Sequence, residues 1–197
     1  RYLELGRRIL QSDGDSKLAR EAFENAVSLN PNSLEGLHSL QNLSQQEGDS
    51  SSFLMFLERE RAIAHGPRYQ FLCMRIGEIH ESQSNLIEAR KAYEKAAEAG
   101  DRRALRYLAS ILSEIGDVPA YADTIRRLVE IEDDVLRKSA LFVRLAEKLK
   151  SENDLEGAWL AFQSALQLTP NDLDSIRGCQ ELVDLDKPQD KVRLLEK

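Results

Sequence analysis

The stretch NLIEARKAYEKAAEAG, residues 85–100, decides the fold of this chain. It places Ala89, Tyr93 and Ala96 on one face of a helix, because side chains three and four residues apart lie above one another. Small residues on that face let a neighbouring helix come close. Two other stretches repeat the spacing, with Ala19, Phe23 and Ala26 in residues 15–30 and with Ala158, Phe162 and Ala165 in residues 154–169. The chain is therefore expected to use one helical unit repeatedly.

A polar turn precedes each of these helices and recurs twice in between. The turns begin at residues 14, 48, 84, 116 and 153, so their spacings are 34, 36, 32 and 37 residues. A period of about 34 residues is typical of a helix–turn–helix repeat. Pro31 and Pro170 stand where two of the second helices should end, because proline cannot continue a helix.

The helix before each turn carries a spacing of its own. An apolar residue is followed three and four residues later by an aliphatic residue and a small one, as in Tyr2, Leu5, Gly6; Cys73, Ile76, Gly77; Leu105, Leu108, Ala109; and Phe142, Leu145, Ala146. In these spacings the chain resembles the tetratricopeptide repeat family over essentially its whole length. The resemblance implies an all-α, right-handed superhelical solenoid of about five to six helix–turn–helix repeats. We expect one continuous domain, residues 1–197, with repeats at 1–33, 34–67, 70–101, 102–135 and 139–172 and a partial repeat at 173–197.

The second repeat departs from the pattern. It has Phe53, Leu57 and Glu60 where Ala, an aromatic residue and Ala are expected. About three extra residues stand near Leu136 to Lys138, between the fourth and fifth repeats. These departures should change local packing angles and not the architecture. The apolar run from residue 53 to residue 57 exceeds what one helix face can bury. Phe53, Leu54 and Phe56 are therefore expected to be exposed and are candidate contacts of a homo-oligomer.

Charge and composition exclude several classes of protein. The net charge is −7 and the isoelectric point is about 5.1, which argues against nucleic acid or an anionic membrane as the main partner. No apolar run approaches the roughly 20 residues of a membrane span. Cys73 and Cys179 lie about three repeats apart, so we expect two buried thiols and a reducing cytoplasm, although a periplasmic repeat protein without disulfides fits the same count. Because the chain opens on Arg1, we expect a fragment or a processed form.

The resemblance also implies a concave surface that is lined by the first helix of each pair and binds peptides. Arg75 and Arg144 hold one equivalent position and Arg106 and Arg177 another, so stacking should align them beside Tyr107. The expected groove residues are His38, Asn42, Arg75, Arg103, Arg106, Tyr107, Arg144 and Arg177. An arginine guanidinium can donate two parallel hydrogen bonds to one carboxylate, which favours an acidic or carboxylate-bearing peptide as the ligand. Alternatively, each arginine pairs with an acid one turn away, for which Glu78 and Glu147 are well placed.

Some family members hold the C-terminus of chaperones in a carboxylate clamp of Lys and Asn, then Asn, then Lys and Arg. The corresponding places here hold His38 and Asn42, then Arg75, then Arg103 and Tyr107. Only Asn42 matches in identity, so we do not expect this clamp.

The sequence gives no sign of catalytic chemistry. It contains three histidines and no phosphate-binding loop, nucleophile elbow or CxxC motif. We therefore expect no enzyme, no metal and no cofactor. The predicted function is a scaffold that binds an extended peptide or a partner helix. Two alternatives stay open: a regulatory or substrate-docking arm of a larger enzyme or secretion protein, and a homo-oligomerisation module.

Overall fold

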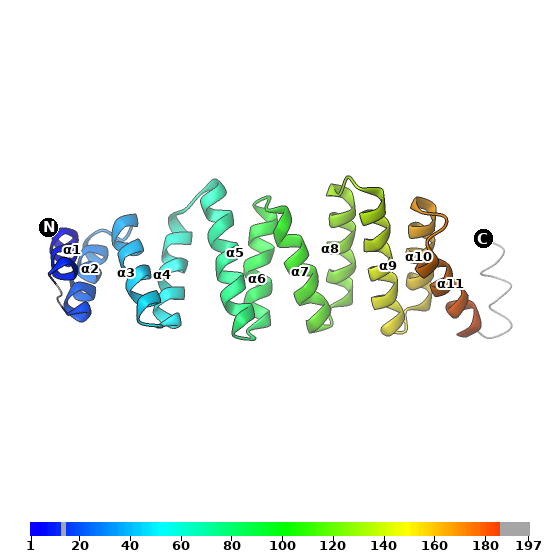
Figure 1. Cartoon of the computed structure of the whole chain (residues 1–197), viewed down its shortest axis with the longest axis horizontal. Coiled ribbons are helices and arrows are strands. Elements are labelled where there is room, and N and C mark those ends of the chain that lie inside the picture. The colour runs from blue at the N-terminus through cyan, green and yellow to red at the C-terminus, as the bar shows by residue number, and fades with distance from the viewer. Residues whose placement is uncertain (13–14, 186–197) are drawn as a thin grey trace. The chain divides into compact units, whose positions relative to one another are not determined.

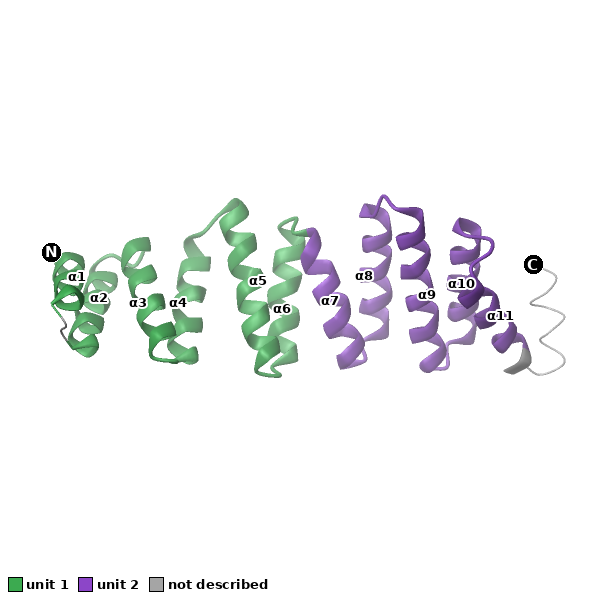
Figure 2. Cartoon of the chain, viewed as in Figure 1, with its two compact units in different colours: residues 1–101 green, residues 102–197 purple. Residues whose placement is uncertain are grey.

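The computed structural model describes residues 1–12 and 15–185. In these residues the chain forms eleven α-helices and no strand (Figure 1). The all-helical repeat fold that the sequence predicts is thus confirmed. The backbone groups the chain into two compact units, residues 1–101 and residues 102–197 (Figure 2), and each is described by itself. The prediction of one continuous solenoid stays a prediction.

Unit 1 consists of three antiparallel helix pairs. The pairs are α1 (Tyr2–Gln11) with α2 (Ser16–Leu29), α3 (Leu34–Gln46) with α4 (Ser50–Ile63), and α5 (Gly66–Ser82) with α6 (Leu86–Glu98). Each helix packs against the next one in sequence. The predicted repeat bounds stay a prediction, and α5 begins at Gly66, four residues before the predicted start of the third repeat.

Unit 2 continues the pattern with two pairs and one further helix. The pairs are α7 (Arg102–Ile115) with α8 (Val118–Ile131) and α9 (Val135–Ser151) with α10 (Leu155–Leu168), and α11 (Leu173–Leu185) follows. α11 packs against α10 and also contacts α9. The predicted partial repeat thus begins with one helix, and its remainder, residues 186–197, lies outside the described residues.

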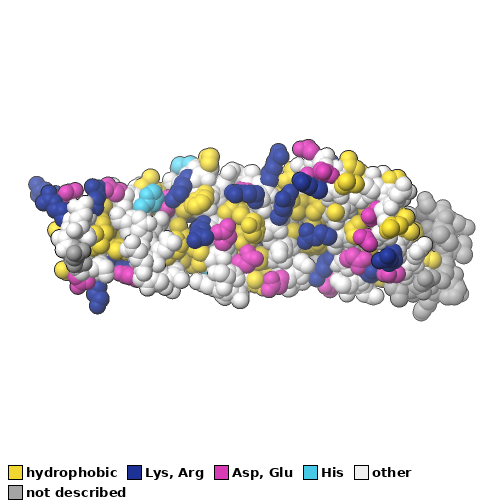
Figure 3. All heavy atoms as spheres, viewed as in Figure 1, with side chains coloured by type: hydrophobic (Ala, Val, Ile, Leu, Met, Phe, Trp, Pro, Cys, Tyr) yellow, Lys and Arg dark blue, Asp and Glu magenta, His cyan; other side chains and the backbone are white. Residues whose placement is uncertain are grey.

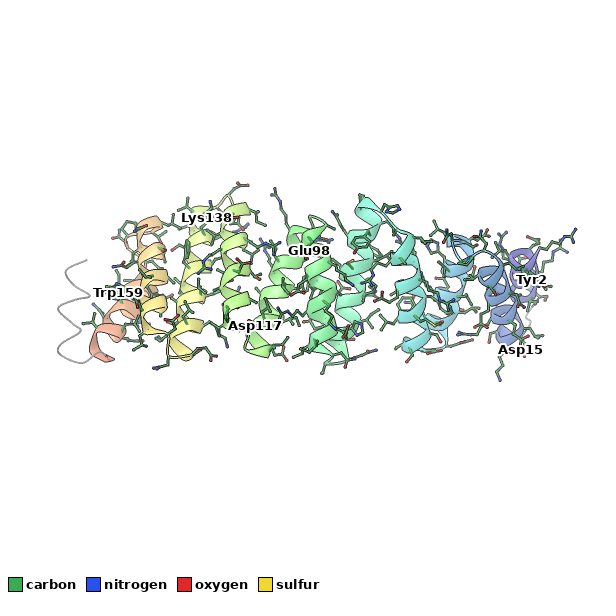
Figure 4. All side chains as sticks on the ribbon, turned by 180° about the vertical axis from the view of Figure 1, so that it is seen from behind. Tyr2, Asp15, Glu98, Asp117, Lys138 and Trp159 are labelled. Atoms are coloured by element: carbon green, nitrogen blue, oxygen red, sulfur yellow. The ribbon has the colours of Figure 1, made fainter. Side chains whose placement is uncertain are left out.

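The short turns inside the pairs explain their polar residues. Gly48, Ser84, Gly116 and Asn153 all have positive φ, between 59° and 82°, at the same place of successive turns. The residue that follows each of them occupies the N-cap position of the next helix. Asp49, Asp117 and Asp154 accept backbone N–H bonds there at 2.9–3.2 Å. Asp15 caps α2 in the same way; Figure 4 labels it and Asp117. Left-handed backbone followed by an N-cap is therefore what the repeated turn encodes.

The repeated Ala, aromatic and Ala positions form the core. Ala19, Ala89 and Ala158 are completely buried, as predicted. Each aromatic ring of this pattern lies against a glycine of a first helix. A Cβ atom on Gly6 would lie 2.6 Å from the Phe23 ring, and one on Gly77 would lie 2.4 Å from the Tyr93 ring. Glycine at these positions is required because the ring occupies the place of a side chain.

The structure corrects the expectation for the second repeat. Phe56 is 1% exposed and belongs to the core of the first two pairs, so its predicted exposure is wrong. Phe53 and Leu54 are half-buried and pack against a cluster that includes Leu57 and Leu72. The helix buries this apolar run because α3 covers one side of α4 and α5 covers the other. The exposed apolar surface proposed for homo-oligomer contacts is therefore much smaller than the sequence suggested.

Two smaller expectations concern cysteine and membrane insertion. Both cysteines are free, and Cys73 is buried whereas Cys179 is only half-buried. Burial raises the pKa of the Cys73 thiol. No helix in the described part of the chain is long and apolar enough to span a bilayer.

Candidate functional site

The eight residues predicted to line a groove fall into both units. Three of them, His38, Asn42 and Arg75, lie on α3 and α5 of unit 1. The other five lie on α7, α9 and α11 of unit 2 and are Arg103, Arg106, Tyr107, Arg144 and Arg177. All eight are exposed, on the first helices of their pairs. Whether they form one continuous ladder stays a prediction, and the surroundings of each residue are what the structure adds.

In unit 1, the central feature is the buried carboxylate of Glu60 on α4. Glu60 is 1% exposed, and its two oxygens accept hydrogen bonds from three side chains. Arg68 at the start of α5 lies 2.7 Å away, the Gln41 amide 2.8 Å and His38 Nε2 3.1 Å. Three helices thus contribute to one network, and His38 belongs to it although its side chain is 47% exposed.

The electrostatics of Glu60 follow from these contacts. Burial by itself would raise the pKa of the Glu60 carboxyl, because it disfavours the charged form. The hydrogen bonds from Arg68, Gln41 and His38 more than offset burial and lower that pKa to about 2. Glu60 is therefore ionised at neutral pH, and the positive charge of Arg68 is largely neutralised inside unit 1.

Sequence reasoning did not identify Arg68. Its guanidinium also lies over the ring of Phe71, 5.0 Å from the ring centre, and Phe71 is 49% exposed. The signal that could have identified Arg68 is Glu60 itself. An acid where the repeat requires a buried alanine needs a cation beside it.

Asn42, one turn after His38, is exposed.

Arg75 follows the alternative that the sequence left open. Its guanidinium pairs with Glu78 on the same helix at 3.1 Å. Both side chains are more than two-fifths exposed, so the pair contributes little to stability. In unit 1 the predicted arginine is thus paired with its own neighbour.

Arg106 of unit 2 has a distant partner. It lies 3.3 Å from Glu132, in the link between α8 and α9, and its own side chain is 67% exposed. Arg137 approaches the same carboxylate at 3.8 Å. Tyr107, the next residue on α7, is 41% exposed. Figure 3 shows basic and acidic side chains beside apolar ones over α7, α8 and α9.

Arg144 differs from the other arginines. The predicted acid Glu147 pairs with Lys150, and Lys150 also reaches Glu181 of α11 at 3.1 Å. Arg144 interacts instead with the buried hydroxyl of Tyr121 on α8. Burial raises the pKa of Tyr121, and the charges of Arg144 and Lys148 act in the opposite direction. No carboxylate pairs with Arg144 within the described residues.

Arg144 borders an open groove of about 810 Å³, here called the α9/α11 groove. Its apolar lining is Leu136, Ala140, Val143, Leu168 and Pro170, and Asp172 and Asp174 lie on the α11 side. Leu136 is 71% exposed, so the groove offers an apolar surface to a ligand. Among the residues of this groove the sequence predicted Arg144 and missed Leu136, which belongs to the extra residues between the fourth and fifth predicted repeats.

Arg177 lies on α11, one turn after Asp174, and is exposed. It makes no ion pair within the part of the chain that the structure describes. An exposed arginine that forms no ion pair is available to a ligand. In unit 2, Arg144 and Arg177 are thus predicted arginines that pair with no acid within the described residues.

Comparison with known families supports the repeat assignment. The family model of the tetratricopeptide repeat matches residues 1–33 and residues 72–99. These two segments contain α1 with α2 and most of α5 with α6, including the contacts of Gly6 with Phe23 and of Gly77 with Tyr93. No curated protein sequence matches the chain.

Solved structures extend the similarity to most of the chain. The chain is similar to YrrB, described as a TPR protein with an unusual peptide-binding site, at a TM-score of 0.52 and 17% identity, with 90% of each chain covered. It is similar to MamA at 0.51 and 13% identity, covering 81% of this chain and 86% of that one. For the Naa15/Naa10 structure bound to HypK-THB the TM-score is 0.53 and the identity 17%, over 94% of this chain and 28% of that one. At such identities the similarity establishes a shared helical-repeat fold.

Proposed function

We propose that this chain of tetratricopeptide repeats is a protein-interaction scaffold that holds an extended peptide on the first-helix face of unit 2. The α9/α11 groove takes an apolar side chain of the peptide, and Arg144 takes a neighbouring carboxylate. Arg177, Arg106 and Tyr107 extend the same face as further contacts. The description of YrrB as a protein with a peptide-binding site supports peptide binding by a fold of this kind.

The observation that carries the proposal is the combination at Arg144. An apolar groove of about 810 Å³ opens beside a guanidinium that no carboxylate pairs within the described residues. Ligand sites are mostly apolar with a few charged or polar groups that fix orientation. A bidentate arginine–carboxylate pair then selects an acidic residue or a chain terminus.

Asp174 on the α11 side sharpens the expected ligand. Asp172 is occupied, since its carboxylate accepts the N–H of Ser175 at 2.9 Å as the cap of α11. Asp174, in contrast, is exposed and lines the groove. A peptide that lies across the groove should therefore present its carboxylate toward α9 and avoid a second acid next to α11.

Titration of labelled short peptides, followed by fluorescence anisotropy, tests the proposal. The peptides carry one Leu or Phe beside either Glu or Lys, and one series ends in a free carboxylate. We expect the acidic and carboxylate-ended peptides to bind and to weaken as salt rises, because exposed charges are screened over about 8 Å at physiological ionic strength. Arg144→Glu should lower the affinity about tenfold or more.

The matched control is Arg102→Glu on α7. Arg102 is also an exposed arginine of unit 2, but it lines neither the α9/α11 groove nor any other groove of this unit described below. It carries the same charge change, so it corrects for the altered net charge of the chain. Equal loss of binding in both variants, or binding that ignores salt, would contradict the proposal.

A further inference from the structure

A second groove, of about 450 Å³, lies on the other side of α9 and is here called the α8/α10 groove. Leu145 lines it, nine residues after Leu136 of the α9/α11 groove. Nine residues are about two and a half helical turns, so these two side chains leave opposite sides of α9. The second groove is therefore separate from the site proposed above, and its occupant is a separate question.

Apolar side chains make up most of the α8/α10 groove. Phe142 and Leu145 of α9 form the floor, Pro119 and Ala122 of α8 one wall, and Leu160 and Ala161 of α10 the other. Leu160 is 56% exposed, although it stands on a helix whose buried face is already complete with Ala158, Phe162 and Ala165. The fold does not need an apolar residue at position 160.

The equivalent helix of unit 1 shows what the fold requires there. Ala89 of α6 corresponds to Ala158 of α10, so Glu88 and Lys91 correspond to Gly157 and Leu160. Glu88 and Lys91 form an exposed ion pair at 2.6 Å, which is an ordinary solvated helix surface. α10 instead has a helix-weakening glycine, which leaves the groove open, and an exposed leucine.

Charge marks one end of the groove. Arg126 of α8 lines it, is exposed, and makes no ion pair among the residues that the structure describes. At the other end Asp154 also lines the groove, but its carboxylate is engaged as the cap of α10, where it accepts the Gly157 N–H at 2.9 Å. A ligand with one carboxylate near Arg126 would therefore complement the groove.

We propose that the α8/α10 groove docks an amphipathic helix of a partner protein. The groove runs along α8 from Pro119 to Arg126, which is about 10 Å or two helical turns. A helix fits a groove of this length because it satisfies its own backbone hydrogen bonds and presents its apolar side chains on one face. The partner helix places apolar side chains at i, i+3 or i+4, and i+7 in the groove and an Asp or Glu beside Arg126.

Selection from a phage-displayed library of helical peptides tests this inference. The library is selected on the wild-type chain and counter-selected on Leu160→Lys. This variant has a lysine at position 160, as α6 has at the equivalent position 91. Leu160 is 56% exposed, so this variant should fold, and circular dichroism with thermal melting verifies that it does. We expect peptides with the i, i+3 or i+4, i+7 apolar pattern and one acid, and we expect Leu160→Lys to weaken their synthetic versions at least tenfold.

Two further variants separate this groove from the first one. Arg126→Glu should weaken the acidic helical peptides and favour versions that carry Lys in place of the acid. Arg144→Glu, on the opposite side of α9, should leave their affinity unchanged, so this inference and the proposed function fail independently.

Selected peptides that bind Leu160→Lys as well as wild type, or a selection that yields no apolar pattern, overturn the inference. Sedimentation in which the wild type dimerises and Leu160→Lys does not would assign the groove to a second copy and overturn it too.

Discussion

Unit 1 and unit 2 use arginines of the first helices in different ways. In unit 1, Arg68 neutralises the buried Glu60 and Arg75 pairs with Glu78. In unit 2, Arg144 has no carboxylate partner within the described residues and borders an apolar groove. The same helical repeat can therefore turn its basic residues inward, where they stabilise packing, or leave them available to a ligand.

The difference has a physical origin in one residue of α4. Glu60 occupies a position where α6 and α10 have the buried Ala96 and Ala165. A buried carboxylate without partners would be strongly unfavourable, so its neighbours have to supply hydrogen bonds and a positive charge. With Glu60 present, Arg68, Gln41 and His38 are committed to its carboxylate. Unit 2 has no such requirement at the equivalent position of α10.

The largest expected effect is on stability, from Arg68→Ala. This change leaves the Glu60 carboxylate buried with only Gln41 and His38 as partners. Removing one partner of a buried ion pair typically costs about 3–5 kcal/mol, and we expect the low end because Arg68 itself is 46% exposed. Urea unfolding followed by circular dichroism measures the loss.

Two control variants make this test specific. Phe71→Ala removes the ring contact of Arg68 and keeps the ion pair. Arg177→Ala removes an exposed arginine of unit 2 and should change the free energy of unfolding by less than about 0.5 kcal/mol. If Arg68→Ala and Arg177→Ala destabilised the chain equally, the proposed difference between the units would be wrong.

The next effect is the pH dependence of unit 1. The pKa of Glu60 is about 2 in the folded chain and 4.5 in the reference state. Because the folded value is the lower one, its stabilisation is complete above about pH 4.5 and is lost as the pH falls toward 2. The shift corresponds to a free energy of roughly 3 kcal/mol.

The measurement is the free energy of unfolding as a function of pH, for wild type and Glu60→Gln. Glutamine keeps the shape and cannot ionise, so the variant should be less stable at neutral pH and should lose less stability between pH 4.5 and pH 2. Parallel curves for the two proteins in this interval would show that Glu60 does not carry the dependence.

The sequence predicted the helices well and the grooves only in part. Ala89, Tyr93 and Ala96 with the turn at Ser84 determine a helix pair through local spacing, which is visible in the sequence. The partner of Glu60 is eight residues away on another helix, and its choice depends on how α4 and α5 pack. A charged residue at an alanine position indicates that a partner of opposite charge lies beside it. The sequence does not indicate which residue that partner is.

The grooves depend on packing distances that the repeat pattern does not contain. Leu136 lies among about three extra residues between the fourth and fifth predicted repeats, at the start of the 17-residue helix α9. The equivalent helix α7 has 14 residues. The extension adds an exposed apolar side chain to the α9/α11 groove, which a comparison of helix faces alone does not reveal.

The smallest expected effect is kinetic and concerns Arg106 and Tyr107 of unit 2. Arg106 is 67% exposed and only partly neutralised by Glu132 at 3.3 Å, so it should attract an acidic peptide before contact. Arg106→Glu should slow association about threefold at low salt, and the difference should vanish as salt rises. Tyr107→Ala should mainly speed dissociation, because it removes an apolar contact. Stopped-flow mixing with the peptide that binds the α9/α11 groove separates the two rates. Arg75→Glu in unit 1 is the matched control, since Arg75 carries the same charge and is already paired with Glu78. If Arg75→Glu slowed association as much as Arg106→Glu, steering would come from the net charge of the chain, and the two units would not differ in the way proposed.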